Sequence, residues 1–113
     1  MDNQLKAEIT QLHAQVCSGL SDSTRILILY KVAEKPINVT DLANALDIPQ
    51  PTVSRHLKVL RERRMVLAQR DGQSVYYSLS DKRIIQALDL LRAVLANSLE
   101  NQAALVRSDS LSS

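Results

Sequence analysis

The sequence of 113 residues contains one cysteine, two glycines and three tyrosines, and it has no phenylalanine and no tryptophan. Because Cys17 is the only cysteine, no disulfide can close within the chain, which favours a reducing compartment. No basic leader followed by an apolar run is present. The apolar runs also fall well short of the roughly 20 residues that span a bilayer. These absences predict a soluble, cytoplasmic protein without a membrane partner.

Scarce aromatic residues leave a core that must be aliphatic. A chain of this length suits one domain with a modest core, which a self-pairing surface would supplement. The net charge of +2 is small, but residues 55–70 contain six cations and only one acid, Glu62. The cations are Arg55, Lys58, Arg61, Arg63, Arg64 and Arg70. Such a patch is typical of a DNA-contacting surface, although a solvated helix face gives the same pattern.

Apolar spacing predicts four helices in the first half of the chain. The first covers residues 2–18 and carries one apolar stripe: Leu5, Ile9, Leu12 and Val16. A second helix, 24–35, follows the N-cap candidates of 21–24 and stops before Pro36. A third, 41–46, has Thr40 as its expected N-cap. The turn 47–49 then leads to a fourth helix, with Pro51 in its first turn.

The fourth helix has two different faces. Val53, Leu57 and Leu60 share the spacing of a core face, and Arg55 and Lys58 fall on the opposite side. Pro49 stands where a capping side chain is expected, so we expect no side-chain cap there.

The second half changes period. Strand-like runs at 65–70 and 74–79 flank Asp71-Gly72-Gln73, a strong hairpin signal. A last helix is expected from a cap at Ser80 or Asp81 to about Val106. Its apolar stripe comprises Ile84, Leu88, Leu91, Leu95 and Leu99. Residues 1–106 are therefore predicted to form one domain, and 107–113 a flexible tail.

Two helices joined by a tight turn and followed by a hairpin predict a winged helix-turn-helix, mainly α with a small β-hairpin and about five helices. In this arrangement the second helix of the pair, which is the fourth helix of this chain, enters the DNA major groove. The residues expected to approach base edges are Gln50, Thr52, Ser54 and Arg55. His56 and Lys58 would support them or hold phosphates, and Arg70 and Gln73 would act from the wing.

Three motifs resemble the ArsR/SmtB family of bacterial transcriptional repressors over about residues 12–99. The motif Thr52-Val53-Ser54-Arg55-His56-Leu57-Lys58-Val59-Leu60 resembles its recognition helix. The stretch 20–29 resembles the entry to its second helix, and Asp71-Gly72 with 76–79 resembles its wing. The resemblance implies a homodimer paired through its first and last helices, bound to an imperfect inverted repeat. An alternative is a helical interaction or antitoxin-like module, but that would not explain Ser54, Arg55 and the wing. No enzyme is expected, because no oxyanion hole or phosphate loop is recognisable.

The family's usual inducer sites are absent from this sequence. The arsenic and cadmium type has two cysteines where this chain reads Asn38-Val39-Thr40, and the persulfide type has one at Tyr30. At the zinc positions Asp81 remains, but Arg83, Val94 and Asn97 cannot supply the other ligands. We therefore expect no metal and no cofactor, and the inducer stays open.

His13 and Cys17 lie four residues apart on the expected first helix. They would complete a metal site only across a dimer. Cys17 is instead a candidate redox sensor, with a packed structural thiol as the simpler alternative.

Overall fold

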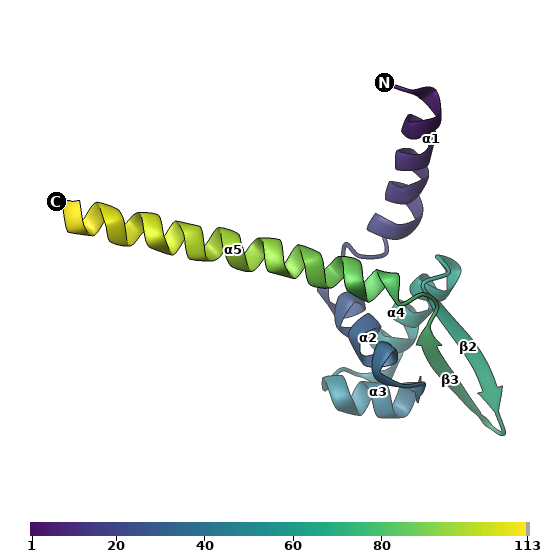
Figure 1. Ribbon diagram of the computed structural model, residues 1–113. Helices are drawn as coiled ribbons and strands as arrows, with labels where there is room; N and C mark the ends of the chain where they lie inside the picture. The colour runs from purple at the N-terminus through teal and green to yellow at the C-terminus, as the bar shows by residue number, and fades with distance from the viewer. Residues whose placement is uncertain (113) are drawn as a thin grey trace. The chain divides into compact units, whose positions relative to one another are not determined.

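The computed structural model describes the backbone of residues 1–112 and the side chains of residues 1–103. The chain divides into two compact units, Met1–Lys82 and Arg83–Ser113. The first unit holds α1 (Asn3–Leu12), the π-helix η1 (His13–Cys17), α2 (Ser23–Glu34), β1 (Ile37–Asn38), α3 (Val39–Leu46), α4 (Gln50–Glu62), β2 (Val66–Asp71) and β3 (Ser74–Leu79). The second contains α5 (Arg83–Ser112) (Figure 1). Within 1–112 the helices and the small sheet confirm the predicted fold class.

The first helix is not the single α-helix that was predicted for 2–18. It changes to a π-helix at His13, where the Ser18 amide donates to the His13 carbonyl at 3.0 Å, five residues back. In an α-helix that amide would donate to Ala14. The Ala14 carbonyl instead accepts from the Ser18 hydroxyl at 2.6 Å and from the Arg63 guanidinium. Competition from these two side chains accounts for the wider turn.

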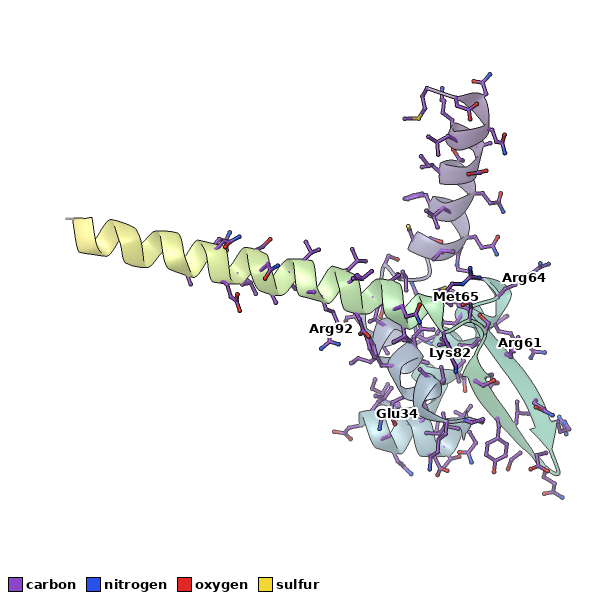
Figure 2. The ribbon with its side chains drawn as sticks, in the orientation of Figure 1. Glu34, Arg61, Arg64, Met65, Lys82 and Arg92 are labelled. Carbon is purple, nitrogen blue, oxygen red and sulfur yellow. The ribbon has the colours of Figure 1, made fainter. Side chains whose placement is uncertain are left out.

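Gly19 follows that turn, at a place where two segments of the chain approach closely. A Cβ at this position would lie 2.9 Å from the Met65 sulfur and 3.2 Å from the Val16 carbonyl oxygen. Met65 is itself buried (Figure 2). Even one methyl group at this position would therefore force Met65 to move.

The core of the first unit is aliphatic, as predicted. Its fully buried side chains come from α2, α3, α4 and the start of the hairpin: Ile28, Leu29, Val32, Leu42, Val53, Leu57, Leu60, Met65 and Val66. The α2 helix begins as expected within the 21–24 cluster. Asp22 is its N-cap, and its carboxylate accepts from the Thr24 amide at 2.8 Å.

The prediction for the start of α3 was wrong. Its N-cap is Asn38, whose side chain accepts from the Asp41 amide at 2.8 Å, so the helix begins earlier than expected. Thr40, the residue predicted to be the N-cap, instead accepts a hydrogen bond from the Gln50 side chain through its hydroxyl. Asp47 then ends α3 in the left-handed conformation, with φ of 55°, which an Asp side chain tolerates. The predicted turn 47–49 follows and leads directly into α4.

The hairpin is part of a three-stranded antiparallel sheet with the order β1-β3-β2. Strand β1 was not predicted; its Ile37 and Asn38 pair with Tyr77 and Tyr76. Because Asp71 pairs with Ser74, the loop is only Gly72-Gln73. Gly72 has φ of +64°, the positive value that a type II′ turn requires at its first loop residue. The wing turn thus forms at the predicted place but is one residue shorter.

The second unit is the α5 helix. It begins at Arg83, later than a cap at Ser80 or Asp81 would place it, and it continues through Ser112. The predicted end near Val106 is therefore wrong, because residues 107–112 continue the helix. The reason is visible in the sequence, since 107–112 contain no proline or glycine to stop a helix. Ser113 lies outside the described residues. None of the helices described in 1–112 combines the length and hydropathy of a membrane span.

Candidate nucleic-acid interface

The α4 helix separates an apolar face from a polar face. The side chains of Val53, Leu57 and Leu60 are at most 1% exposed to solvent, which confirms the predicted core face. On the polar side Ser54, Arg55 and Lys58 are exposed, and Thr52 and His56 are half-buried. The buried face holds the helix against the body, so the polar face is presented to solvent on a fixed support.

The start of α4 has no side-chain cap, as the sequence indicated. Pro49 occupies the cap position, and its carbonyl accepts from the Thr52 amide at 3.0 Å and the Val53 amide at 3.1 Å. The Gln50 side chain donates to the Thr40 hydroxyl at 3.0 Å. This bond joins α3 to the first residue of α4, and it holds the Gln50 amide group at the exposed end of the helix.

Arg55 is the exposed cation nearest the start of α4. Its Nη2 lies 3.4 Å from the Thr52 hydroxyl, one turn earlier on the helix. That contact leaves most of the guanidinium donors open, because arginine carries five N–H groups in a planar fork. Arg55 can therefore reach either the paired acceptors of a guanine edge or a phosphate.

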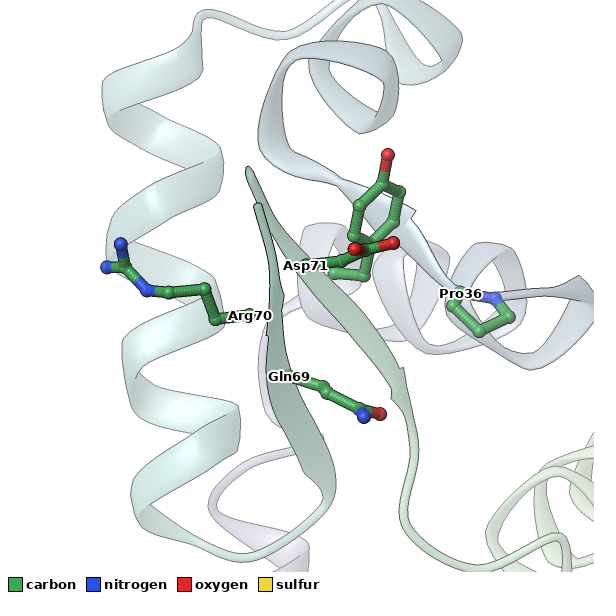
Figure 3. A pocket seen from close by; sticks show the side chains of 5 residues that line it. Pro36, Gln69, Arg70 and Asp71 are labelled. Atoms are coloured by element: carbon green, nitrogen blue, oxygen red, sulfur yellow. The ribbon is translucent and has the colours of Figure 1, made fainter. Parts of the chain in front are cut away.

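The wing presents Arg70 and Gln73 in different ways. Arg70 lies two and four residues after Ala68 and the buried Val66, so it shares their face of β2. Figure 3 shows Arg70 on one side of the hairpin and Gln69 on the other. Gln73 is exposed in the two-residue loop at the tip. Arg70 therefore lies on the face of β2 that also carries the buried Val66, and Gln73 lies at the tip of the hairpin.

A groove lies beside the wing. It has a volume of about 530 Å³ and is lined by Pro36, Gln69, Arg70, Asp71 and Tyr76 (Figure 3). An acid, an amide and a phenol in an open groove lack the apolar walls that enclose most small-molecule ligands. The groove therefore indicates a polar edge of the wing rather than an inducer pocket.

The basic stretch that the sequence showed is divided by the structure. Arg63 is used inside the fold, where it donates to the Ala14 carbonyl. Arg61 and Arg64 are exposed at the far end of α4 (Figure 2). Of the six cations in this stretch, only Arg55, Lys58 and Arg70 were predicted to contact DNA. The number of cations in the stretch therefore overstates the size of the predicted site.

Arg25 is a residue whose part in this site the sequence analysis missed. Its Nε donates to the Gly19 carbonyl at 2.7 Å, and its Nη2 lies 3.2 Å from the Ser18 carbonyl and 3.3 Å from the Ser21 hydroxyl. Its Nη1 lies 3.3 Å from Nδ1 of His56 on α4. One side chain therefore joins the turn before α2 to the polar face of α4. The only available signal was the threonine–arginine pair after the α2 cap, which does not reveal a partner 31 positions away.

Asp22 stands next to this cluster. The Thr24 amide, which donates to the carboxylate, lowers the pKa of Asp22 below its ordinary value of 3.8, and the backbone amide and the charge of Arg25 lower it further. Since the folded-state pKa is below the unfolded value, the stabilisation is present above about pH 4 and is lost as the pH falls through the folded pKa.

We expect Asp22→Asn to flatten the pH dependence of the unfolding free energy below about pH 4, because asparagine keeps the cap but cannot be protonated there. The measurement is urea denaturation across that range for both proteins. Asp2→Asn, at the exposed cap of α1, is the matched control. Parallel curves for wild type and Asp22→Asn would contradict the prediction.

Cys17 is exposed and ends the π-helix. His13 and Cys17 are the first and last residues of the π-helix. Among residues 1–103 no group of three or more His, Cys, Asp or Glu side chains is placed to hold a metal ion. The exposed thiol is accessible to oxidants, and its role as a redox sensor stays a prediction.

Comparison with known proteins adds to this geometry. Residues 22–67, which run from the α2 cap into β2, match the family described as "Bacterial regulatory protein, arsR family". The chain is 37% identical over 89 residues to the HTH-type transcriptional regulator NmtR of Mycobacterium tuberculosis, covering 79% of this chain and 71% of NmtR. The chain belongs to the ArsR family. It is accordingly an ArsR-type DNA-binding transcriptional regulator with a winged helix-turn-helix.

Solved structures of other proteins share the fold of this chain. NolR from Sinorhizobium fredii is 30% identical with a TM-score of 0.72, over 83% of this chain and 93% of that chain. The homodimeric winged helix-turn-helix DNA-binding domain of Mb0332 from Mycobacterium bovis is 26% identical with a TM-score of 0.75, over 89% and 93%. NmtR is named as a transcriptional regulator and not as an enzyme. Family membership thus supports the regulator over the interaction-module alternative.

Proposed function

We propose that this ArsR-family regulator is a cytoplasmic homodimer that binds an inverted-repeat operator and represses transcription. The observation that carries the proposal is the two-faced α4 helix. Its apolar face is fully buried, and its polar face presents Arg55, Ser54 and Lys58 to solvent. A helix anchored in this way can enter a major groove without loss of its own packing.

In the proposed complex the residues have separate tasks. Arg55 reads a base edge, with Gln50, Thr52 and Ser54 beside it on α4. Lys58 contacts the phosphate backbone and His56 supports the reading residues. From the wing, Arg70 and Gln73 contact the adjacent backbone or minor groove.

Two apolar stripes support the homodimer. In α1 the side chains of Leu5, Ile9 and Leu12 are 42%, 47% and 50% exposed. The α5 helix exposes a longer set: Leu90, Leu91, Val94, Leu95 and Leu99. Contiguous exposed aliphatic residues on a helix mark a surface that pairs with another protein surface. A two-fold dimer would place its α4 helices about 34–36 Å apart, which matches an inverted repeat.

We expect Arg55→Ala to weaken binding to the operator by about 1–3 kcal/mol, because a good bidentate contact to a base contributes that much discrimination. Binding to random DNA should change much less. The measurement is fluorescence anisotropy with an operator duplex and a scrambled duplex at fixed salt. The operator is found by selection of bound sequences from a random pool.

Lys58→Ala is the matched control for Arg55→Ala, since it also removes one exposed cation from α4. It should weaken both duplexes equally and reduce the salt slope of log K by about one. An equal loss on both duplexes for Arg55→Ala would assign Arg55 to phosphate. A wild-type protein that retards neither duplex at low salt would contradict the proposed function itself.

Peroxide is expected to lower operator affinity of the wild type, and Cys17→Ser should abolish that response. The reason is that Cys17 is exposed in a π-turn that leads into the turn held by Arg25, where oxidation would add polar bulk. Operator affinity is measured before and after oxidation, and again after reduction with dithiothreitol. If wild type and Cys17→Ser respond alike, the thiol is structural.

A further inference from the structure

The hydrogen bond between Arg25 and His56 fixes which ring nitrogen carries the proton. A guanidinium group has only donors and stays protonated at any physiological pH. The ring atom Nδ1, 3.3 Å from Nη1 of Arg25, must therefore be the acceptor. A neutral imidazole with an unprotonated Nδ1 carries its proton on Nε2. A doubly protonated ring would instead direct two donors and two positive charges at each other.

The remaining ring atom, Nε2, is then a donor that has no hydrogen-bond partner among the side chains of residues 1–103. The residue is only half-buried. His56 also follows Arg55 directly on α4. A neutral N–H in this position is suited to an acceptor outside the protein, such as a phosphate oxygen.

The Arg25 guanidinium is itself held in place by hydrogen bonds. Three of its contacts go to the 18–21 turn, at 2.7 Å to the Gly19 carbonyl, 3.2 Å to the Ser18 carbonyl and 3.3 Å to the Ser21 hydroxyl. These contacts leave little freedom for Nη1, because the guanidinium is planar and its donors point in fixed directions. The position of His56 is thus set from outside α4.

We propose that Arg25 is a positioning residue for DNA recognition, which selects the Nε2–H form of His56 and fixes it on α4 so that His56 donates to a phosphate oxygen of the operator. This inference rests on the proposed function. It also sharpens the role of His56, which becomes a neutral donor with a defined proton rather than a general supporting residue.

The first test is the ¹⁵N spectrum of the His56 ring at neutral pH. We expect the wild type to show one neutral tautomer with the proton on Nε2, and Arg25→Ala to show both tautomers. Lys31→Ala is the matched control, because it removes a cation from α2 that forms a salt bridge with Glu34 on the same helix; its spectrum should equal that of the wild type. A wild-type ring protonated on Nδ1, or on both nitrogens, would overturn the proposal.

The second test measures operator affinity for a double-mutant cycle. Arg25→Ala and His56→Ala should each weaken binding about tenfold, as loss of a charge-assisted hydrogen bond would. The double variant should lose about the same factor, because Arg25 acts through His56. Lys31→Ala should stay within about threefold of the wild type. A double variant weakened by the product of the two single factors would overturn the coupling.

These readouts separate the two levels of the inference. If the wild type binds no operator, the proposed function fails, while the ring spectrum still decides whether Arg25 sets the tautomer. Should Arg25→Ala not fold, the wild-type spectrum with and without operator decides: DNA must shift the Nε2 proton and leave Nδ1 unprotonated. An Nε2 proton that does not respond to bound operator would overturn the proposal.

Discussion

Replacement of Leu91 and Leu95 by glutamate is expected to convert the proposed homodimer to monomers and to weaken operator binding by on the order of 10²–10⁴-fold. Both side chains are exposed on α5, by 62% and 59%, so a charge there costs the single chain little. In a dimer the same charges would be buried without partners. Operator affinity falls because each protomer reaches only one half-site, and linked binding of two half-sites contributes a factor of this size.

The measurements are light scattering after size-exclusion chromatography and operator retardation at equal protein concentration. Gln86→Glu with Asn97→Glu is the matched control, since it adds the same charge at exposed polar positions of α5. The control protein should remain dimeric and bind normally. A Leu91→Glu, Leu95→Glu protein that stays dimeric would place the interface elsewhere.

Leu57→Ala is expected to lower the free energy of unfolding by about 2–5 kcal/mol, the range for a leucine whose removal leaves a cavity. Leu57 is only 1% exposed and lies midway between Val53 and Leu60 on the buried face of α4. The loss is a large part of the stability of a small domain, so the variant should also lose operator binding at elevated temperature.

Urea denaturation at one fixed protein concentration is the appropriate measurement, because dimer formation makes the midpoint depend on concentration. Lys58→Ala, next in sequence and exposed, should change the unfolding free energy by no more than about 0.5 kcal/mol. A small effect of Leu57→Ala would mean that α4 is not anchored by its apolar face, which would weaken the argument for DNA reading.

Local patterns in the sequence were enough to predict the helices and the wing. The spacing of Val53, Leu57 and Leu60 identified the buried face of α4, and Asp71-Gly72 located the hairpin. Both signals are short-range, since helical periodicity and turn chemistry depend on neighbouring residues. Pro49 likewise indicated the missing side-chain cap that the structure confirms.

Features that depend on distant partners were not predictable. One of the two side chains that occupy the Ala14 carbonyl at the π-turn is that of Arg63, which looked in the sequence like one more surface cation. The pairing of Ile37 and Asn38 with β3 was also missed, because two residues carry no strand pattern. Arg25 joins the turn before α2 to His56 in the same way. In each case a side chain or short segment acts through a partner far away in sequence.

Pro49 and Pro51 also limit which groups of α4 can hold a phosphate. The first turn of a helix normally offers several free backbone amides to an anion. Here neither proline has an N–H, and the Thr52 amide already donates to the Pro49 carbonyl. At most the Gln50 amide remains for this purpose. The first turn of α4 therefore has few main-chain donors for a DNA phosphate, so contacts there must come from side chains. The register of the protein on DNA then depends on residues that substitution can change.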